Sequence, residues 1–238
     1  MAEHFVLVHA PVVGPASWAP VARELAGSGH RVTVPVLSGF WSDGPPYAQS
    51  LVRRAGRQLP EPGGEHIVIA VHSGAGVFAP YLAEAVLASG ADGGTVTVVF
   101  VDAAVPPQSG DVTVVDSDFL PVLRDMADDG VVPPWPLWWP QEVMAELIPD
   151  QETRRSVVAE APALPLAFFE ETLPAVPESW QSCRPAYLRL SAGYQQPASE
   201  AASRGWPVRE LPGDHLHMCV EPAAVAAVLL DLAAAATA

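Results

Sequence analysis

The sequence predicts an α/β fold in which a doubly wound, mostly parallel sheet carries a helical cap inserted between two late strands. Three observations support this. Short unbroken apolar runs alternate with helical patterns over residues 1–105, as in parallel sheets that are covered on both faces. A stretch rich in Pro and Trp, residues 106–182, interrupts the alternation. The alternation then resumes, so we expect residues 1–105 and 183–238 to form the core domain and residues 106–182 the cap.

The elements follow from hydrophobic periodicity. Apolar runs predict strands at residues 5–9, 31–36, 66–71, 95–102, 186–190 and 207–211. Helical patterns predict core helices at residues 17–28, 47–59, 74–88, 199–203 and 222–234. Further helices are expected within the cap near residues 119–128, 141–147 and 151–160. We expect the cap to be structured, because a loop of this length without secondary structure is uncommon.

Composition and charge exclude several classes of protein. Of the 238 residues, 50% are hydrophobic and only 16% are charged, which is the opposite of a disordered chain. The net charge of −15 repels phosphate backbones and anionic lipids, so we expect neither a nucleic-acid nor a membrane partner. All 12 basic residues are arginines. The absence of lysine excludes Schiff-base, pyridoxal-phosphate and P-loop chemistry.

The cysteines and the N-terminus point to an intracellular protein. Cys183 and Cys219 are the only two cysteines, which is too few for a disulfide framework or a four-cysteine zinc site. The chain starts without a basic leader, and acidic residues interrupt its longest apolar stretches. We therefore expect a soluble cytoplasmic protein, whose oligomeric state the sequence does not indicate.

A serine at a strand-to-helix turn is the candidate nucleophile. The segment Val-His-Ser-Gly-Ala-Gly, residues 71–76, stands where an apolar strand ends and a helix begins. A sharp turn there exposes Ser73 at the carboxyl edge of the sheet and aims the Gly74 amide at a developing oxyanion. Val71 and Ala75 stand where the Gly-x-Ser-x-Gly pattern has glycine. The alternative is a serine that only caps the helix.

The candidate general base is His215. It lies between the last predicted strand and the last helix, so we expect it at the same edge of the sheet as Ser73. Imidazole titrates near neutrality, as a general base requires. His217 competes with it. A helix-capping histidine and a His-x-His metal site are further alternatives, but the distant cysteines and scattered acids favour no metal.

Three carboxylates compete to orient this imidazole. Asp102 ends the fourth predicted strand, where a buried carboxylate is costly without a partner. Glu200 lies well beyond the fifth strand, and Asp214 adjoins His215 on an extended segment, where neighbouring side chains point apart. We prefer Asp102, which also fits the order Ser, acid, His along the chain; the alternative is that Asp102 caps its own turn.

The loop after the first strand is expected to supply the second oxyanion donor. Pro11 stands in this loop and has no N–H to donate. The oxyanion hole must therefore combine Gly74 with another group, either the Val12 amide or the His9 side chain.

Together these segments resemble the α/β-hydrolase superfamily, and most closely its compact capped members in the plant methylesterase and hydroxynitrile-lyase-like branch. The matching stretches are residues 5–14 with Trp18, 29–32, 72–76, 101–103 with Pro106, and 213–215. They cover most of the sheet core, whereas the cap matches only in position. The resemblance implies a triad of Ser73, His215 and an acid. Many members place the acid after the strand that here ends near residue 190, but a variant places it after the preceding strand, at Asp102.

Three functions are open at this point. The favoured one is a serine-dependent hydrolase of an ester or thioester, in which Ser73 attacks, His215 carries the proton and Asp102 orients the imidazole. The second is a non-hydrolytic tailoring enzyme, a cyclase or lyase with the same Ser, His and Asp. Its support is the substituted elbow glycines and the Trp-rich cap. The third is a binding module without catalysis.

The cap suggests a substrate class. The candidates to line a pocket for a flat apolar ligand are the aromatic residues Trp135, Trp138, Trp139, Trp180, Phe168 and Phe169, although they could simply pack the cap onto the core. We expect an uncharged apolar small molecule, with an aromatic or polyketide-like skeleton as the leading option. No cofactor is expected, because the glycines at 74 and 76 lack the third glycine of a dinucleotide-binding loop.

Overall fold

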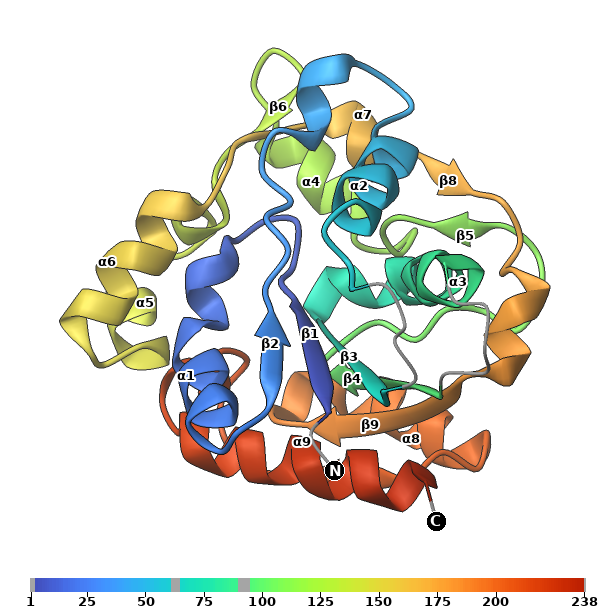
Figure 1. Cartoon of the computed structure of the whole chain (residues 1–238). Coiled ribbons are helices and arrows are strands. Elements are labelled where there is room, and N and C mark those ends of the chain that lie inside the picture. The colour runs from blue at the N-terminus through green and yellow to red at the C-terminus, as the bar shows by residue number, and fades with distance from the viewer. Residues whose placement is uncertain (1–2, 61–64, 90–94, 238) are drawn as a thin grey trace.

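Six parallel strands form the central sheet of the computed structural model, which describes residues 3–60, 65–89 and 95–237. The predicted core segments also include residues 1–2, 61–64, 90–94 and 238, which lie outside the described residues. The strand order is β10-β9-β4-β3-β1-β2, and every pairing in this sheet is parallel (Figure 1). The strands are β1 His4–Val8, β2 Arg31–Thr33, β3 Ile67–His72, β4 Val96–Val101, β9 Arg184–Arg189 and β10 Val208–Glu210. The predicted doubly wound parallel sheet is confirmed.

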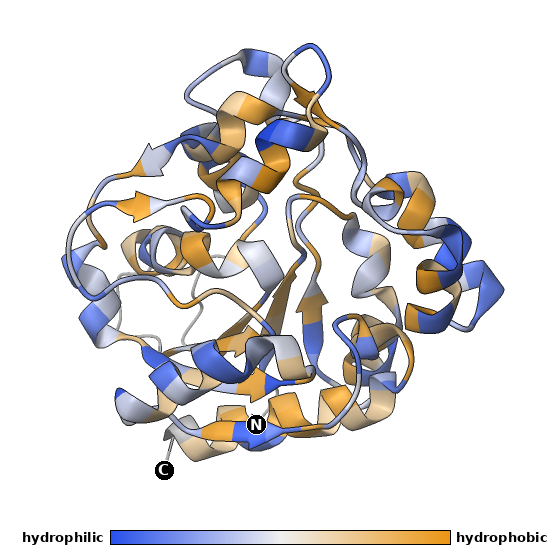
Figure 2. Cartoon of the chain, turned by 180° about the vertical axis from the view of Figure 1, so that it is seen from behind, coloured by the Kyte–Doolittle hydropathy of each residue, from blue (hydrophilic) through white to orange (hydrophobic). Residues whose placement is uncertain are grey.

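Side chains of the strands alternate between two hydrophobic cores. On β3, Ile67, Ile69 and Val71 belong to one buried cluster, and Val68 and Ala70 belong to the other. Helices α2 Tyr47–Gly56, α3 Ala79–Ser89 and α8 Gln195–Ser203 cover the first face, and α1 Ala19–Gly27 and α9 Pro222–Thr237 cover the second. Since both faces are buried, the strand positions are mostly apolar, and the central strands are accordingly mostly orange in Figure 2.

Some element boundaries differ from the sequence prediction. The helix expected over 74–88 is a 3-10 helix, η3 Ser73–Phe78, followed by α3. The strand expected over 31–36 ends at Thr33, and the helix expected over 199–203 begins four residues earlier, as α8. Such differences arise because apolar periodicity locates an element better than it locates the element's ends. Among the described residues, no helix combines the length and apolarity needed to cross a membrane.

The insertion between β4 and β9 contains short strand pairs, which the sequence did not predict, in addition to its helices. It contains the three expected helices, α4 Leu120–Met126, α5 Gln141–Leu147 and α6 Gln151–Glu160, and a short α7, Leu166–Phe169. It also contains two antiparallel strand pairs, β5 Val112–Thr113 with β8 Thr172–Leu173 and β6 Val131–Val132 with β7 Leu164–Pro165. Two-residue strands are too short to show alternation in a sequence, and their partners lie far along the chain.

Two carboxylates tie this insertion to the rest of the chain. Glu171 accepts hydrogen bonds from the first two amides of α2, those of Tyr47 at 2.8 Å and Ala48 at 2.6 Å. Glu160, at the end of α6, accepts one from the Ala16 amide at 2.6 Å. These contacts hold the insertion over the carboxyl edge of the sheet, with α4 and α7 near α2 and α5 and α6 near α1 (Figure 1).

Candidate active site

Ser73 occupies a strained turn directly after β3. Its φ of 57° lies in the left-handed region, which a residue with a side chain adopts only where the surroundings enforce it. Two backbone hydrogen bonds enforce it here: the Ser73 amide donates to the Asp102 carbonyl at 3.1 Å, and the Ala104 amide donates to the Ser73 carbonyl at 3.1 Å. The turn after β3 is therefore fastened to the end of β4.

Close packing behind this turn explains the departure from the glycine pattern. A Cβ atom at Gly76 would lie 2.0 Å from the carbonyl oxygen of Ala104, so only glycine fits there. A Cβ atom at Gly74 would meet nothing closer than Pro11 Cδ at 4.0 Å. The position that requires glycine in this chain is therefore residue 76, whereas the Gly-x-Ser-x-Gly pattern places its last glycine at residue 75, which is Ala75 here.

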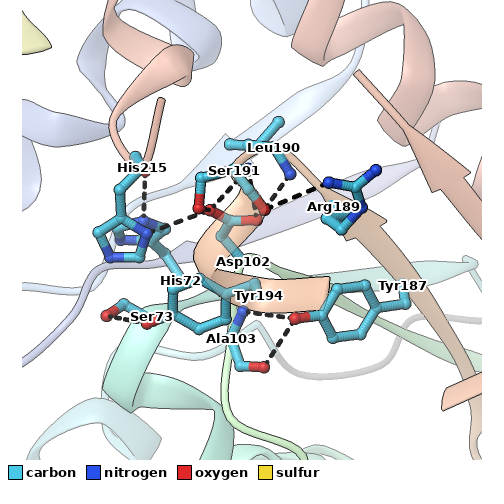
Figure 3. Close-up of polar contacts among 10 residues, drawn as sticks. All are labelled: His72, Ser73, Asp102, Ala103, Tyr187, Arg189, Leu190, Ser191, Tyr194 and His215. Atoms are coloured by element: carbon cyan, nitrogen blue, oxygen red, sulfur yellow. Dashed lines mark hydrogen bonds and ion pairs between the residues drawn. The ribbon is translucent and has the colours of Figure 1, made fainter. Parts of the chain in front are cut away.

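Asp102 lies fully buried at the end of β4 and contacts the candidate base. Its Oδ2 lies 3.2 Å from Nδ1 of His215 (Figure 3). The carboxylate also accepts from the Leu190 amide at 2.6 Å and from the Ser191 hydroxyl at 2.5 Å. These donors satisfy a buried charge that would otherwise be costly, and they fix the carboxylate beside the imidazole.

The competing residues lie elsewhere. Glu200 pairs with Arg204, which caps the C-terminus of α8, at 2.5 Å, and Asp214 is exposed. The His217 ring packs on the backbone of Gly213. Among the described residues, only Asp102 brings a carboxylate to His215; its catalytic role stays a prediction.

His72, which precedes the candidate nucleophile, anchors the loop of His215. Its Nε2 donates to the backbone carbonyl of His215 at 3.0 Å. Burial lowers the pKa of His72 well below its usual value, and the neighbouring His215 lowers it further. The neutral His72 ring therefore acts as a hydrogen-bond donor that joins the end of β3 to the segment after β10.

Tyr194 contacts both Ser73 and His215. It ends the short helix η6 Ala192–Tyr194, which follows β9. Its hydroxyl oxygen lies 3.3 Å from Ser73 Oγ, and its ring stacks on the His215 imidazole with centroids 4.9 Å apart and planes 4° apart. Among the described contacts, Tyr194 is the hydrogen-bond partner of the Ser73 side chain, and none joins Ser73 Oγ to His215.

A cavity of about 610 Å³ opens onto these residues. Ser73 and His215 line it, as do the expected aromatic residues Trp135, Trp138, Trp139, Phe168 and Phe169. Trp180 does not line it, because its ring packs against Phe100 and Trp206. Of the described residues that line it, none is an arginine, and Asp116 is the only carboxylic acid. The cavity is of the size and apolar character typical of small-molecule sites.

The predicted oxyanion donors separate into two groups. Val12 and Gly74 line the cavity. The Val12 amide donates no hydrogen bond among the described contacts, and the Gly74 amide, in the first turn of η3, has no acceptor inside that helix. His9 does not line the cavity, because its Nδ1 donates to the Ala10 carbonyl at 2.8 Å and its Nε2 accepts from the Leu37 amide at 3.4 Å. The His9 side chain is therefore not the second donor.

Buried His9 makes stability depend on pH. Burial lowers its pKa to about 4 from 6.5. Between these values the unfolded chain binds a proton that the folded chain does not, so stability falls as the pH drops below about 6.5. We expect His9 to account for a loss of about 2 kcal/mol between pH 7.5 and pH 5. Urea unfolding at pH 7.5 and at pH 5 measures the decrease in the free energy of unfolding, which should be smaller in His9→Asn than in the unmodified protein by this amount. An equal decrease in the two proteins would show that His9 is not its cause.

The His, Cys, Asp and Glu side chains of the described residues were the candidates for a metal site. Across residues 3–60, 65–89 and 95–237, no group of three or more His, Cys, Asp or Glu side chains is placed to hold a metal ion. The His-x-His segment at 215–217 directs its first ring to Asp102 and packs its second on Gly213.

Solved structures with a similar backbone identify the fold. An extracellular alpha/beta-hydrolase from a Paenibacillus species, described as sharing structural and functional homology with tobacco salicylic acid binding protein 2, matches with a TM-score of 0.69 at 20% identity, over 97% of this chain and 98% of that one. The chain has the α/β-hydrolase fold. A mutant of polyneuridine aldehyde esterase matches with a TM-score of 0.69 at 20% identity (98% and 99% covered), and a mutant of tomato methylketone synthase I with 0.70 at 20% (99% of each). No family model and no curated protein matches the sequence.

Within this α/β-hydrolase fold, sequence reasoning missed three residues of the site: His72, Ser191 and Tyr194. Each follows a recognisable signal. His72 adjoins the candidate nucleophile, and Ser191 and Tyr194 follow β9, after which the sequence has no acid before Glu200. Polar side chains that follow a buried parallel strand lie at the edge where such folds bind ligands. The same rule, extended from acids to hydroxyl groups, would have predicted Ser191 and Tyr194.

Proposed function

We propose that the chain is a serine hydrolase that cleaves an ester or thioester of an apolar small molecule. The observation that supports this best is the convergence of three chain segments: the strained Ser73 after β3 and His215 after β10 line one cavity, and the buried Asp102 after β4 contacts His215 from behind. The fold alone hosts many reactions, so the site supplies the evidence.

The proposed mechanism follows from these positions. Ser73 Oγ attacks the acyl carbon, and its proton passes to His215, whose Nδ1 is held by Asp102. His215 returns the proton to the departing alkoxide or thiolate. A water molecule then attacks the acyl-enzyme, and its proton passes through His215 to Ser73 Oγ. The Gly74 and Val12 amides are the proposed donors to the oxyanion.

The cavity supports an uncharged, aromatic or polyketide-like substrate. Tyr194 and six aromatic side chains of the cap line it: Phe119, Trp135, Trp138, Trp139, Phe168 and Phe169. Flat rings suit such walls, and an anionic substrate would find no arginine among the described lining residues. We expect kcat/KM for 4-nitrophenyl benzoate to exceed that for the 4-nitrophenyl monoester of succinic acid by at least about 100-fold; a preference for the succinate would refute this substrate class.

Labelling with a fluorophosphonate tests the nucleophile. We expect intact-mass and peptide analysis to find the adduct on Ser73, and we expect Ser73→Ala to lower the hydrolysis of 4-nitrophenyl benzoate by at least about 10⁴-fold. His215→Ala should lower the labelling rate as well, because the hydroxyl then lacks its base. An unlabelled Ser73, together with ligand binding and no turnover, would favour a binding module.

A second candidate is a cyclase or lyase that uses the same residues without an acyl-enzyme. The observation that favours it is that, among the described contacts, Ser73 Oγ hydrogen-bonds with Tyr194 and with no imidazole. Two hydroxyls could then hold a carbonyl oxygen while His215 removes a proton from a neighbouring carbon. Turnover that survives in Ser73→Ala but is lost in His215→Ala would favour this reaction over hydrolysis.

A further inference from the structure

The residue after β9 that contacts both the nucleophile and the base has no role in the proposed triad. Tyr194 is half-buried, its hydroxyl meets Ser73 Oγ at 3.3 Å, and its ring covers one face of His215 (Figure 3). We propose that Tyr194 is a second catalytic hydroxyl, which donates a hydrogen bond to Ser73 Oγ and stabilises the negative charge that develops on that oxygen. This inference rests on the proposed hydrolase function.

The chemistry of the two hydroxyls decides which one donates. Burial raises the pKa of Tyr194, the hydrogen bond with Ser73 lowers it, and the Asp102 carboxylate raises it again, with a net increase. The phenol therefore stays protonated near neutral pH, and it is a far stronger acid than the hydroxyl of a serine. When Tyr194 donates to Ser73 Oγ, the proton of Ser73 remains available to His215.

The effect falls mainly on the step in which Ser73 Oγ leaves. In deacylation water attacks the acyl carbon, the bond from that carbon to Oγ breaks, and the electron pair stays on Oγ until His215 delivers the proton. Tyr194 donates a hydrogen bond throughout and loses no proton. A preorganised donor stabilises charge most when the charge is localised, and the leaving Oγ carries that charge while the acyl-enzyme breaks down.

The stacked ring has a separate role. The imidazole of His215 is held at Nδ1 by Asp102 and on one face by the parallel Tyr194 ring. Tyr194→Phe removes the hydroxyl and keeps the ring, whereas Tyr194→Leu removes both. The pair of variants separates donation to Oγ from support of the imidazole.

The test measures acylation and deacylation with 4-nitrophenyl benzoate. We expect Tyr194→Phe to lower kcat about 10-fold or more, with a pre-steady-state burst of nitrophenol and a benzoyl adduct on Ser73 by intact mass during turnover. Tyr47→Phe, on α2 outside the lining residues, is the matched control and should behave like the unmodified protein. Tyr194→Leu should in addition shift the pH profile of kcat/KM.

The outcomes separate this proposal from the function on which it rests. Fluorophosphonate labelling of Ser73 in Tyr194→Phe shows that the nucleophile is intact. With labelling intact, an unchanged or increased kcat, or a decrease without accumulated acyl-enzyme, overturns the role of the hydroxyl. Failure of Ser73 to label in the unmodified protein instead overturns the hydrolase. Thermal melting followed by circular dichroism checks that both Tyr194 variants are folded. The Ser73→Ala variant loses the same hydrogen bond, so we expect its melting temperature to equal that of Tyr194→Phe.

Discussion

Replacing Asp102 by asparagine is expected to lower kcat by about 10⁴-fold with little change in KM. The asparagine retains an oxygen that can accept from the Leu190 amide, but it loses the charge that stabilises protonated His215. Its amide nitrogen would also face Nδ1 and favour the tautomer that cannot accept a proton from Ser73. Steady-state kinetics with 4-nitrophenyl benzoate, at matched folded fraction by circular dichroism, measures the loss.

Ser191→Ala is the matched control for this variant. It removes the hydroxyl that donates to Asp102 Oδ2 at 2.5 Å and leaves the contact between Asp102 and His215 in place. We expect a decrease in kcat of about 10-fold at most, since one neutral donor to a carboxylate is removed. If Asp102→Asn lost no more activity than Ser191→Ala, another group would have to orient His215.

The fold was predictable because buried parallel strands leave a strong trace in a sequence. The five residues of β1 and the six of β3 are all buried, and apart from a histidine at one end of each strand they form unbroken apolar runs, as expected for strands covered on both faces. The candidate nucleophile, base and acid followed from one geometric rule, since each comes soon after a parallel strand ends. The rule needs only the order of elements, which periodicity supplies.

The remaining contacts of the site depend on side-chain directions that no local pattern contains. The stacking of Tyr194 on His215 joins residues 21 positions apart through the turn after β9. The exclusion of His9 from the oxyanion hole has the same origin. The residue follows β1 at the correct edge of the sheet, but its ring hydrogen-bonds with the backbone of Ala10 and Leu37 and does not point into the cavity. The position of a residue after a strand predicts that it lies near the site, whereas the direction of its side chain decides whether it takes part in the site.

Gly76→Ala is expected to destabilise the fold by about 3 kcal/mol or more. The added Cβ would lie 2.0 Å from the Ala104 carbonyl oxygen, and this atom belongs to backbone that cannot rotate away. Relief would require the turn after β3 to part from the end of β4, which breaks the hydrogen bonds of Ser73 with Asp102 and Ala104. Urea unfolding, or the soluble yield if the variant fails to fold, measures the effect.

Gly74→Ala tests whether the contact, and not the loss of a glycine, causes this instability. Its Cβ would meet only Pro11 Cδ, at 4.0 Å, which is ordinary van der Waals contact, so we expect a change in stability below about 1 kcal/mol. Equal stability of the two variants would mean that the two strand ends can separate. In that case the fit between the strand ends would not be what holds the strained φ of Ser73, and with it the direction of the hydroxyl.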